Sequence, residues 1–402
     1  MKTIRLVVFN EEFWGKGLIY SQNILPLLSL KRAKGINVEL VSFTSIAMML
    51  KKRHIIKESR RLLKEKGVSV REFPVLYYPT RFLLPYWYIL PYFYLNVFIY
   101  ILRLRLMDAG KEVQYNLRSY QPALAFYSLY GHKERLVFDP RTDFVEEKMN
   151  AGHFKEGGWS MKFWRYMEGQ FVRNFKKTIV ISDTFRNNLI KKHNIKDASK
   201  IVILYNPINY SHFSRAKEAH SGYIFLYTGS IGGWNKLENY LSLYLIFHKR
   251  NLNSRFIICT SAAREKIEAV ITLPEYTEIS NSIEVHYNVP YEELPGIYAQ
   301  CDYGFQIMKK KDSRVGVKFI EYVSAGVVPI INNNVQGAAV LAERYNMGVI
   351  LNDDDSEEQI CEKIMNAKPI DRESVEYLKF KSLTDTANIA ERLEKIYFDG
   401  TL

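Results

Sequence analysis

Cysteine is scarce in this sequence of 402 residues, which contains only Cys259, Cys301 and Cys361. The three are far apart, odd in number and without the spacing of metal ligands, so we interpret them as reduced thiols of a cytosolic protein. We also expect no secretory signal, because the apolar run near the N-terminus is short and no small-residue cleavage site follows it. We therefore expect a cytoplasmic protein.

Nucleic-acid modules are absent too: the sequence has no zinc-finger spacing, no RRM or KH signature and no basic tail. The net charge of +13 nevertheless indicates an acidic partner, such as a phosphorylated ligand or an anionic membrane surface. Lysine and arginine concentrate in the first half of the chain, at 51–66, 103–111, 132–135, 148–177 and 186–200. This asymmetry favours a first domain that binds to an anionic surface. The alternative is that these residues form a solvated charged face.

Residues for nucleophilic or metal catalysis are not grouped in the sequence. No Ser-His-Asp or Cys-His arrangement can be assembled from the spacing. The acidic run at 352–358 precedes a helical pattern, so we interpret it as an N-capping turn rather than a metal site, and we expect no metal and no cofactor. Among the histidines, only His153 lies in a polar loop beside an acidic cluster, which makes it a catalytic candidate.

Apolar strand-like runs alternate with helical patterns in both halves of the chain. In the first half we predict strands at 4–9, 37–43, 69–74, 114–117, 135–138 and 178–181. In the second half we predict them at 223–229, 255–260, 283–287, 303–308, 328–331 and 347–351. Strand, helix and strand within about 40 residues form a βαβ unit, which requires a parallel sheet. The fold class is therefore α/β, with two doubly wound domains in series.

The domain boundaries follow from a Pro-containing joint and a polar stretch without periodicity. We place a first domain at 1–205, a linker at 206–221 and a second domain at 222–385. The last segment, 386–402, is expected to be a helix that can cross back to the first domain.

An apolar and aromatic segment at 81–106 interrupts this regularity and is long enough to suggest a membrane span. Pro85 and Pro91 argue against one continuous spanning helix, and the many tyrosines suit an interface better than a hydrocarbon core. A buried or interdomain helix and an interfacial membrane-docking helix are the two main interpretations.

The run KFIEYVSAGVVPII at 318–331 combines a helical pattern with an apolar strand. The pattern predicts that Glu321 lies in the first turn of the helix, at the end of a parallel sheet where ligands bind. A carboxylate there can accept two hydrogen bonds from a vicinal diol, such as the ribose of a nucleotide. The alternative is a glutamate that only complements the helix dipole.

Two loops carry groups suited to a diphosphate. In the first loop, 227–239, Gly229, Gly232 and Gly233 allow close backbone approach, and Lys236 adds a positive charge. An ordinary strand–helix turn is the alternative. The second loop, 309–321, adds Arg314 and Lys318 next to Glu321.

With these motifs the second half resembles the retaining nucleotide-sugar glycosyltransferases of family 4, which have the GT-B fold: two Rossmann-like domains facing across a cleft. Lys236 stands at the family's lysine position, and EYVSAG with Pro329 matches its later run. The resemblance implies that Glu321 binds the donor ribose, that Lys236 holds the diphosphate, and that Asn288 and Val289 read the base. Ser230 stands where the family has an arginine, and Ser313 where it has a second glutamate.

The first half resembles the acceptor domain of a subset of the same family, at 116–124 and 137–154. By this resemblance we assign catalytic roles to Asp139 and Arg141 beside His153. We assign acceptor-binding roles to five residues: Gly15, Gly17, Arg118, Asp143 and Glu146. A solvated charged loop is the alternative for the acidic segment.

The resemblance implies transfer of a sugar, with retention, from a nucleotide-diphospho-sugar to a lipid-linked or cell-envelope saccharide, as in polysaccharide or lipopolysaccharide biosynthesis. The expected place is the cytoplasm, peripheral at the inner face of the membrane. Partners would be the donor, a saccharide or glycolipid acceptor and an anionic membrane surface, without nucleic acid. The alternatives are a GT-B nucleotide-sugar epimerase and a non-catalytic GT-B-like membrane-surface binding protein.

Overall fold

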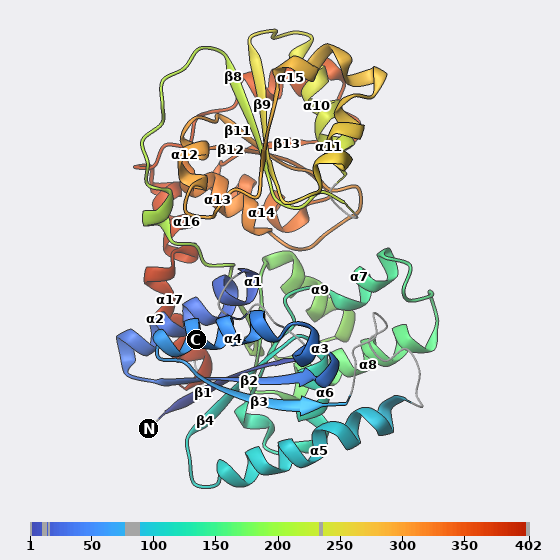
Figure 1. Ribbon diagram of the computed structural model, residues 1–402, viewed down its shortest axis with the longest axis vertical. Helices are drawn as coiled ribbons and strands as arrows, with labels where there is room; N and C mark the ends of the chain where they lie inside the picture. The colour runs from blue at the N-terminus through green and yellow to red at the C-terminus, as the bar shows by residue number, and fades with distance from the viewer. Residues whose placement is uncertain (1, 10–13, 15–16, 77–88, 233–235, 399–402) are drawn as a thin grey trace. The chain divides into compact units, whose positions relative to one another are not determined.

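The computed structural model describes residues 2–9, 14, 17–76, 89–232 and 236–398 (Figure 1). The chain divides into two compact units. Unit 1 comprises Met1–Pro207 and Thr386–Leu402, and unit 2 comprises Ile208–Asp385. Most of the segment predicted as a linker thus belongs to unit 2, where the Tyr210 hydroxyl and the Thr384 hydroxyl are 2.7 Å apart.

Unit 1 contains a seven-stranded parallel sheet in the order β3-β2-β1-β4-β5-β6-β7. The strands are β1 (Thr3–Phe9), β2 (Asn37–Ser45), β3 (Ser69–Val75), β4 (Val113–Arg118), β5 (Leu136–Asp139), β6 (Lys177–Val180) and β7 (Ile201–Ile203). The sequence analysis predicts the first six and misses β7, whose three residues are too short to give a pattern.

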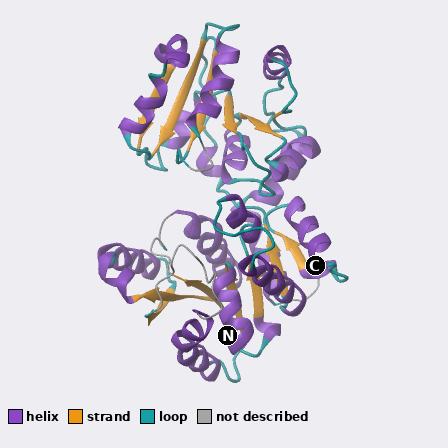
Figure 2. Ribbon diagram, turned by 90° about the vertical axis from the view of Figure 1, so that its right-hand side faces the viewer, coloured by secondary structure: helices purple, strands orange, loops and turns teal. Residues whose placement is uncertain are grey.

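Helices cover both faces of this sheet (Figure 2). They are α1 (Gly17–Ile19), the π-helix η1 (Tyr20–Ile24), α2 (Leu25–Lys34), α3 (Ile46–Lys51), α4 (Arg53–Glu65), α5 (Ile89–Met107), α6 (Tyr120–Leu129), α7 (Phe144–Asn150), α8 (Trp159–Asn174), α9 (Asp183–His193) and α17 (Ile389–Tyr397). The basic segment 51–66 belongs to two helices, α3 and α4, which meet at Lys52.

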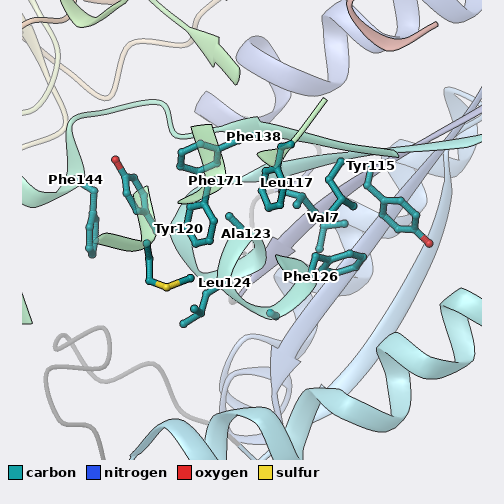
Figure 3. Packing of buried hydrophobic residues seen from close by; sticks show 14 of the residues in the cluster. Val7, Tyr115, Leu117, Tyr120, Ala123, Leu124, Phe126, Phe138, Phe144 and Phe171 are labelled. Carbon is teal, nitrogen blue, oxygen red and sulfur yellow. The ribbon is translucent and has the colours of Figure 1, made fainter. Parts of the chain in front are cut away.

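The alternation of side chains along β1 explains why both faces are covered. Ile4, Leu6 and Val8 join one buried cluster with α2, α4 and α17. Val7 points to the other face and joins a cluster with α5, α6 and α8, part of which Figure 3 shows. A strand buried on both faces reads as a continuous apolar run, which is what the sequence of β1 shows.

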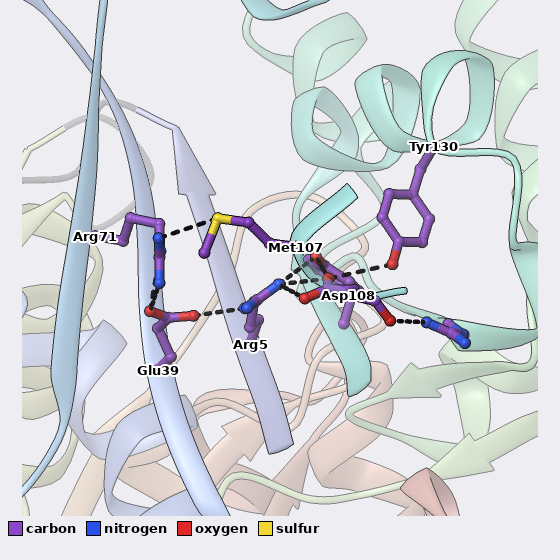
Figure 4. A network of polar contacts seen from close by, with 8 residues as sticks. Arg5, Glu39, Arg71, Met107, Asp108 and Tyr130 are labelled. Carbon is purple, nitrogen blue, oxygen red and sulfur yellow. Dashed lines mark hydrogen bonds and ion pairs between the residues drawn. The ribbon is translucent and has the colours of Figure 1, made fainter. Parts of the chain in front are cut away.

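Buried charges tie the sheet of unit 1 to the end of α5 (Figure 4). Arg5 in β1 donates to Glu39 in β2 across 2.5 Å, and it also pairs with Asp108, which directly follows α5. Arg71 in β3 donates to the same Glu39 across 2.8 Å. Since each buried charge has an opposite charge beside it, the network fixes the C-terminal end of α5 against the sheet.

Unit 2 contains a six-stranded parallel sheet in the order β10-β9-β8-β11-β12-β13. The strands are β8 (Tyr223–Thr228), β9 (Ser254–Thr260), β10 (Ile283–Tyr287), β11 (Tyr303–Gln306), β12 (Val328–Asn332) and β13 (Val349–Leu351). The helices are α10 (Leu237–His248), α11 (Arg264–Ile271), α12 (Leu294–Ala299), α13 (Val317–Ala325), α14 (Gln336–Tyr345), α15 (Glu357–Met365) and α16 (Val375–Thr384). Two doubly wound parallel sheets are confirmed.

The acidic run at 352–358 forms the start of a helix. Ser356 caps α15 and makes a reciprocal capping box with Gln359, while Glu357 and Glu358 lie in the first turn. The N-capping interpretation of this run is therefore confirmed.

The apolar segment at 81–106 is described from Ile89, where α5 begins, whereas 77–88 lie outside the described residues. Pro91 is in the first turn of α5, where a proline leaves no helical hydrogen bond unmade. By length and composition, Leu90–Met107 could cross a membrane, with a mean hydropathy of 1.2. The inward side of the helix is nevertheless part of the core of unit 1.

Candidate functional site

The chain order of the strands marks one position at the carboxyl edge of the unit 2 sheet. From β8 the chain moves outward to β9 and β10, then returns to place β11 on the other side of β8. Open α/β sheets bind ligands at such a reversal, where the loops after the two central strands separate. The loop after β8 begins at Gly229, and the loop after β11 leads into α13.

Gly229 and Lys318 meet at this reversal. Gly229 has a φ of +128°, and a Cβ placed on it would lie 2.8 Å from Cε and 3.0 Å from Nζ of Lys318. The same ammonium group lies 4.9 Å from the centre of the Tyr227 ring. A glycine is thus required here both for the backbone conformation and for the space that the lysine side chain fills.

Burial lowers the pKa of Lys318 below its ordinary value, and the nearby carboxylate of Glu321 opposes this effect. The lysine points from α13 to the Gly229 loop, so a positive charge stands where the carboxyl ends of β8 and β11 separate. A diphosphate is a suitable partner for a cation in such surroundings.

Glu321 is the fifth residue of α13, which begins at Val317. The prediction that it lies in the first turn of the helix is wrong, because the helix starts before the charged segment, directly after Gly316. The Tyr298 hydroxyl lies 3.1 Å from Glu321 Oε2 and 2.9 Å from Thr228 Oγ1. Its hydrogen bond to Glu321 holds the carboxylate beside the end of β8.

Burial raises the pKa of Glu321, and the hydrogen bond from Tyr298 and the charge of Lys318 offset part of the rise. The sequence analysis did not name Tyr298 or Thr228. Tyr298 lies in α12, the helix after the loop assigned to base reading, so its position in the sequence was the one available signal.

The other residues of the first loop have separate surroundings. The Gly229 amide donates to the Cys259 carbonyl across 2.8 Å, so it is already used within the sheet. Ser230 accepts a hydrogen bond from the Tyr227 hydroxyl at its carbonyl, across 2.7 Å. Gly232 has a φ of +129°, and no described heavy atom outside its chain neighbours lies within 4 Å of a Cβ placed on it, while Gly233 lies outside the described residues.

Lys236 is exposed at the N-cap position of α10. Arg314 is paired with Asp312, to which its Nε donates across 2.9 Å. Lys318 is therefore the cation that the structure places against the glycine loop. Ser313, at the position of the family's second glutamate, is buried.

Asn288 and Val289 follow β10, at the same edge of the sheet as Gly229. Asn288 is held at a φ of +54°, and its amide donates to the Thr260 carbonyl across 2.9 Å. This turn fixes the backbone that the resemblance assigns to base reading.

Unit 1 has its own polar cluster where β4 and β5 end. Asp139 is fully buried and accepts hydrogen bonds from Asn23, across 2.7 Å, and from Arg141, across 2.8 Å. Arg118 donates to the Asn23 side chain, and Arg141 has a φ of +63°. The structure thus brings the predicted Asp139, Arg141 and Arg118 together, through an asparagine from η1 that the sequence analysis did not name.

Asp143 and Glu146 are engaged within unit 1. Asp143 caps α7 and accepts a hydrogen bond from Lys192 across 2.7 Å, while burial followed by the nearby Glu168 charge raises its pKa. Glu146 pairs with Arg165 across 2.7 Å. Glu168 is fully buried and accepts hydrogen bonds from Tyr120 and His193. The sequence analysis missed this glutamate.

The remaining candidates are His153, Gly17 and Gly15. His153 is exposed and follows α7, whose seven residues separate it from Asp143 by about 10 Å of helix. Gly17 begins α1 with a φ of +68°, and Gly15 lies outside the described residues. Nothing in the described part of the chain groups three or more histidine, cysteine, aspartate or glutamate side chains for a metal ion.

A cavity of about 500 Å³ opens elsewhere on unit 2, where β8, β11 and β12 begin. Lys217, Glu218, Asp302, Asp371 and Arg372 line it. Because ligands of open α/β sheets bind at the carboxyl edge, and because acids outnumber bases here, we do not assign the nucleotide to this cavity.

The sequence matches no family model, and no curated protein matches it. Several solved structures do resemble it along its full length. Sucrose-phosphate synthase from Thermosynechococcus elongatus has a TM-score of 0.66 at 12% identity, over 99% of this chain and 99% of that chain. The chain has the GT-B fold.

Two further neighbours with this fold are a galactosyltransferase and a protein that holds UDP and glucose. The lipopolysaccharide outer core galactosyltransferase WaaB, in its apo form, has a TM-score of 0.65 at 11% identity, over 99% of both chains. Anabaena Alr3699/HepE, in complex with UDP and glucose, has a TM-score of 0.63 at 13% identity, over 98% of this chain and 99% of that chain. At such identities the likeness concerns the fold.

Proposed function

We propose that this protein is a retaining glycosyltransferase that moves a sugar from a nucleotide-diphospho-sugar to a saccharide or glycolipid acceptor. The observation that carries the proposal is the meeting of Gly229, Lys318 and Glu321 at the chain reversal of the unit 2 sheet. The UDP and glucose bound to a neighbour of the same fold support a nucleotide-sugar donor.

In this proposal each group of unit 2 recognises one part of the donor. The Glu321 carboxylate accepts hydrogen bonds from the ribose hydroxyls, and its link to Tyr298 keeps one oxygen in place. Lys318 and the N-terminal dipole of α13 stabilise the negative charge that develops on the departing diphosphate. The backbone at Asn288 and Val289 lies against the base.

Unit 1 holds the acceptor in this proposal. Asp139 and Arg141 form the buried end of a polar cluster that reaches Arg118. Hydroxyl-rich ligands suit such a set of paired donors and acceptors. The departing phosphate accepts the proton of the acceptor hydroxyl, so the reaction requires no side-chain base.

We place the enzyme in the cytoplasm, peripheral at the inner face of the membrane, with a lipid-linked or cell-envelope saccharide as acceptor. Unit 1 holds 37 lysines and arginines against 20 aspartates and glutamates, a net charge of +17, whereas unit 2 holds 19 against 23. The positive charge is therefore confined to the unit that binds the acceptor in our proposal, as an anionic surface requires.

A thermal-shift screen of nucleoside diphosphates and nucleotide sugars tests donor binding. A ligand at 100 times its dissociation constant should stabilise the protein by about 2.7 kcal/mol. The best donor is then incubated with membrane glycolipids, and the product is analysed by NMR for its anomeric configuration. We expect release of the nucleoside diphosphate and a product with the donor's configuration.

Three results would contradict the proposal. A converted sugar that remains on its nucleotide indicates an epimerase. A product of opposite anomeric configuration excludes retention. If no nucleotide binds and Glu321→Ala changes nothing, the protein is a non-catalytic member of the fold.

A further inference from the structure

The helix α5 has two apolar sides, and the described residues of unit 1 pack against only one of them. Phe93, Val97, Ile101 and Leu104 point inward, and each is at most 1% exposed. They pack within the core cluster that also contains β1, β4 and α6 residues. A helix of a soluble domain needs no more than this one apolar stripe.

The opposite side of α5 is apolar as well and faces away from unit 1. Its exposed members are Tyr92, Leu95, Phe98, Ile99, Leu102 and Leu106, which we call the outer face. Leu95 is 75% exposed, Leu106 69% and Ile99 65%. A contiguous apolar surface of this kind marks an interaction site, because single exposed apolar residues are common but a row of them is not.

We propose that the outer face of α5 docks unit 1 onto the surface of an anionic lipid bilayer, with the helix axis in the plane of the membrane. The inference deepens the proposed function, on which it rests, by naming the surface that brings the enzyme to a lipid-linked acceptor. With 19 residues, α5 would lie along about 28 Å of the interface.

Charge favours lipid over a second copy of the chain. The sequence of α5 has no aspartate or glutamate, and the exposed Arg103 and Arg105 flank the outer face near its C-terminal end. Unit 1 as a whole carries a net charge of +17. Two copies joined through this face would bring like charges together, whereas anionic headgroups would neutralise them.

Packing favours docking over spanning. The inward stripe of α5 is sealed in the core, and the buried Asp108 at its end pairs with Arg5 of β1. If α5 crossed the membrane, its inward stripe and Asp108 would both have to leave unit 1. Arg5 would then lose this partner, which is costly for a buried charge. Leu76, also exposed, donates its amide to the Asn96 side chain of α5 across 2.9 Å and widens the apolar surface.

The three native cysteines are buried, so a single added cysteine can be labelled selectively. Full-length Phe98→Cys is labelled with an environment-sensitive fluorophore and mixed with vesicles of phosphatidylglycerol and phosphatidylcholine. We expect a blue shift and an intensity rise of about twofold or more, with little change on phosphatidylcholine alone. A label at Leu252→Cys, a position on unit 2 that is even more exposed than Phe98, should not respond.

Flotation of unlabelled protein with the same vesicles gives an independent measurement. Leu95→Glu combined with Ile99→Glu should lower the bound fraction about tenfold or more, whereas Leu252→Glu should leave it unchanged. Failure of the native protein to float with anionic vesicles overturns the proposal, as does an equal loss in the Leu252 control. A native dimer that the double variant converts to a monomer, by light scattering, assigns the face to a second copy instead.

Nucleotide binding separates this inference from the proposed function. The thermal shift caused by UDP is measured without vesicles, in the native protein and in the double variant. An unchanged shift shows that the variant is folded. If no nucleotide binds but the native protein still floats, the proposed function fails while the docking surface stands. If nucleotide binds but the native protein does not float, only the proposed docking surface is refuted.

Discussion

The Tyr298 hydroxyl donates a hydrogen bond to Glu321 Oε2 across 3.1 Å, although the two residues belong to helices that flank β11 in the chain. The bond directs one oxygen of the carboxylate and leaves the other for a ligand. This relationship turns a glutamate that would otherwise only interact with its own helix into a fixed hydrogen-bond acceptor. The first three predictions depend on it and on the neighbouring Lys318.

Glu321→Gln should lower the affinity for nucleoside diphosphates about 10- to 100-fold, because charge-assisted hydrogen bonds to the ribose are lost. Calorimetry with ribo- and deoxyribonucleotides measures the effect. The preference for the ribonucleotide should shrink in the variant. Glu343→Gln, an exposed change on α14, is the matched control, and an equal loss there would refute a ribose contact.

Lys318→Met should weaken the binding of a nucleoside diphosphate much more than that of the nucleoside, because the charge that faces the Gly229 loop disappears. The dependence of affinity on salt should also become less steep. Lys309→Met removes an exposed charge from the loop after β11 and serves as control. Equal effects on diphosphate and nucleoside would show that Lys318 does not contact phosphate.

As the pH decreases, the affinity for nucleotide should begin to fall at a higher pH than it would with a glutamate of ordinary pKa. The pKa of Glu321 is raised above its ordinary value of 4.5, so the carboxylate that accepts from ribose is protonated at a pH above that value. At high pH, the lowered pKa of Lys318 means that its charge is lost below pH 10.5. Calorimetry across pH tests this, and Glu321→Gln should abolish the acidic decrease.

Glu168→Gln should destabilise unit 1 by about 3–5 kcal/mol, since it takes the buried carboxylate away from His193 and leaves the half-buried Lys192 with Asp143. Burial alone would raise the pKa of Glu168, but the His193 bond and the Lys192 charge hold it below 4.5. The stability that this depressed pKa provides is present above pH 4.5 and is lost as the pH falls through the folded value. The difference in the free energy of unfolding between the native protein and the variant should therefore shrink at acidic pH.

Urea unfolding followed by tryptophan fluorescence measures this difference, because Trp164 lies 5.9 Å from the Tyr120 ring in the same cluster. Glu134→Gln, at an exposed site, should change stability by less than about 0.5 kcal/mol. A similar cost at both positions would contradict the role of the buried cluster.

Gly229→Ala should destabilise unit 2 by about 1–2 kcal/mol more than Gly232→Ala. The two glycines have φ values of +128° and +129°, so both substitutions strain the backbone, but only a Cβ at 229 meets the Lys318 side chain. Urea midpoints of the two variants provide the comparison. Equal midpoints would show that Lys318 moves aside without cost.

The sequence predicts much of this molecule because its signals are local. Buried parallel strands need continuous apolar runs, and these runs alternate with helical patterns. Glu321, Lys318 and Gly229 are visible for the same reason, since Gly229 directly follows β8 and the other two lie in the short helix α13. The start of α13 was misjudged, because Gly316 is followed by an apolar residue rather than by an obvious cap.

The sequence by itself thus determined two parallel α/β sheets and the loops that carry charge at their carboxyl edges. Only the tertiary structure decided which of those charges remain available: Arg314 is paired with Asp312, while Lys318 reaches Gly229. It also decided that Tyr298 supports Glu321 and that α5 keeps an apolar side exposed. Such pairings depend on strand order and on the direction of each helix face, which periodicity along the chain does not encode.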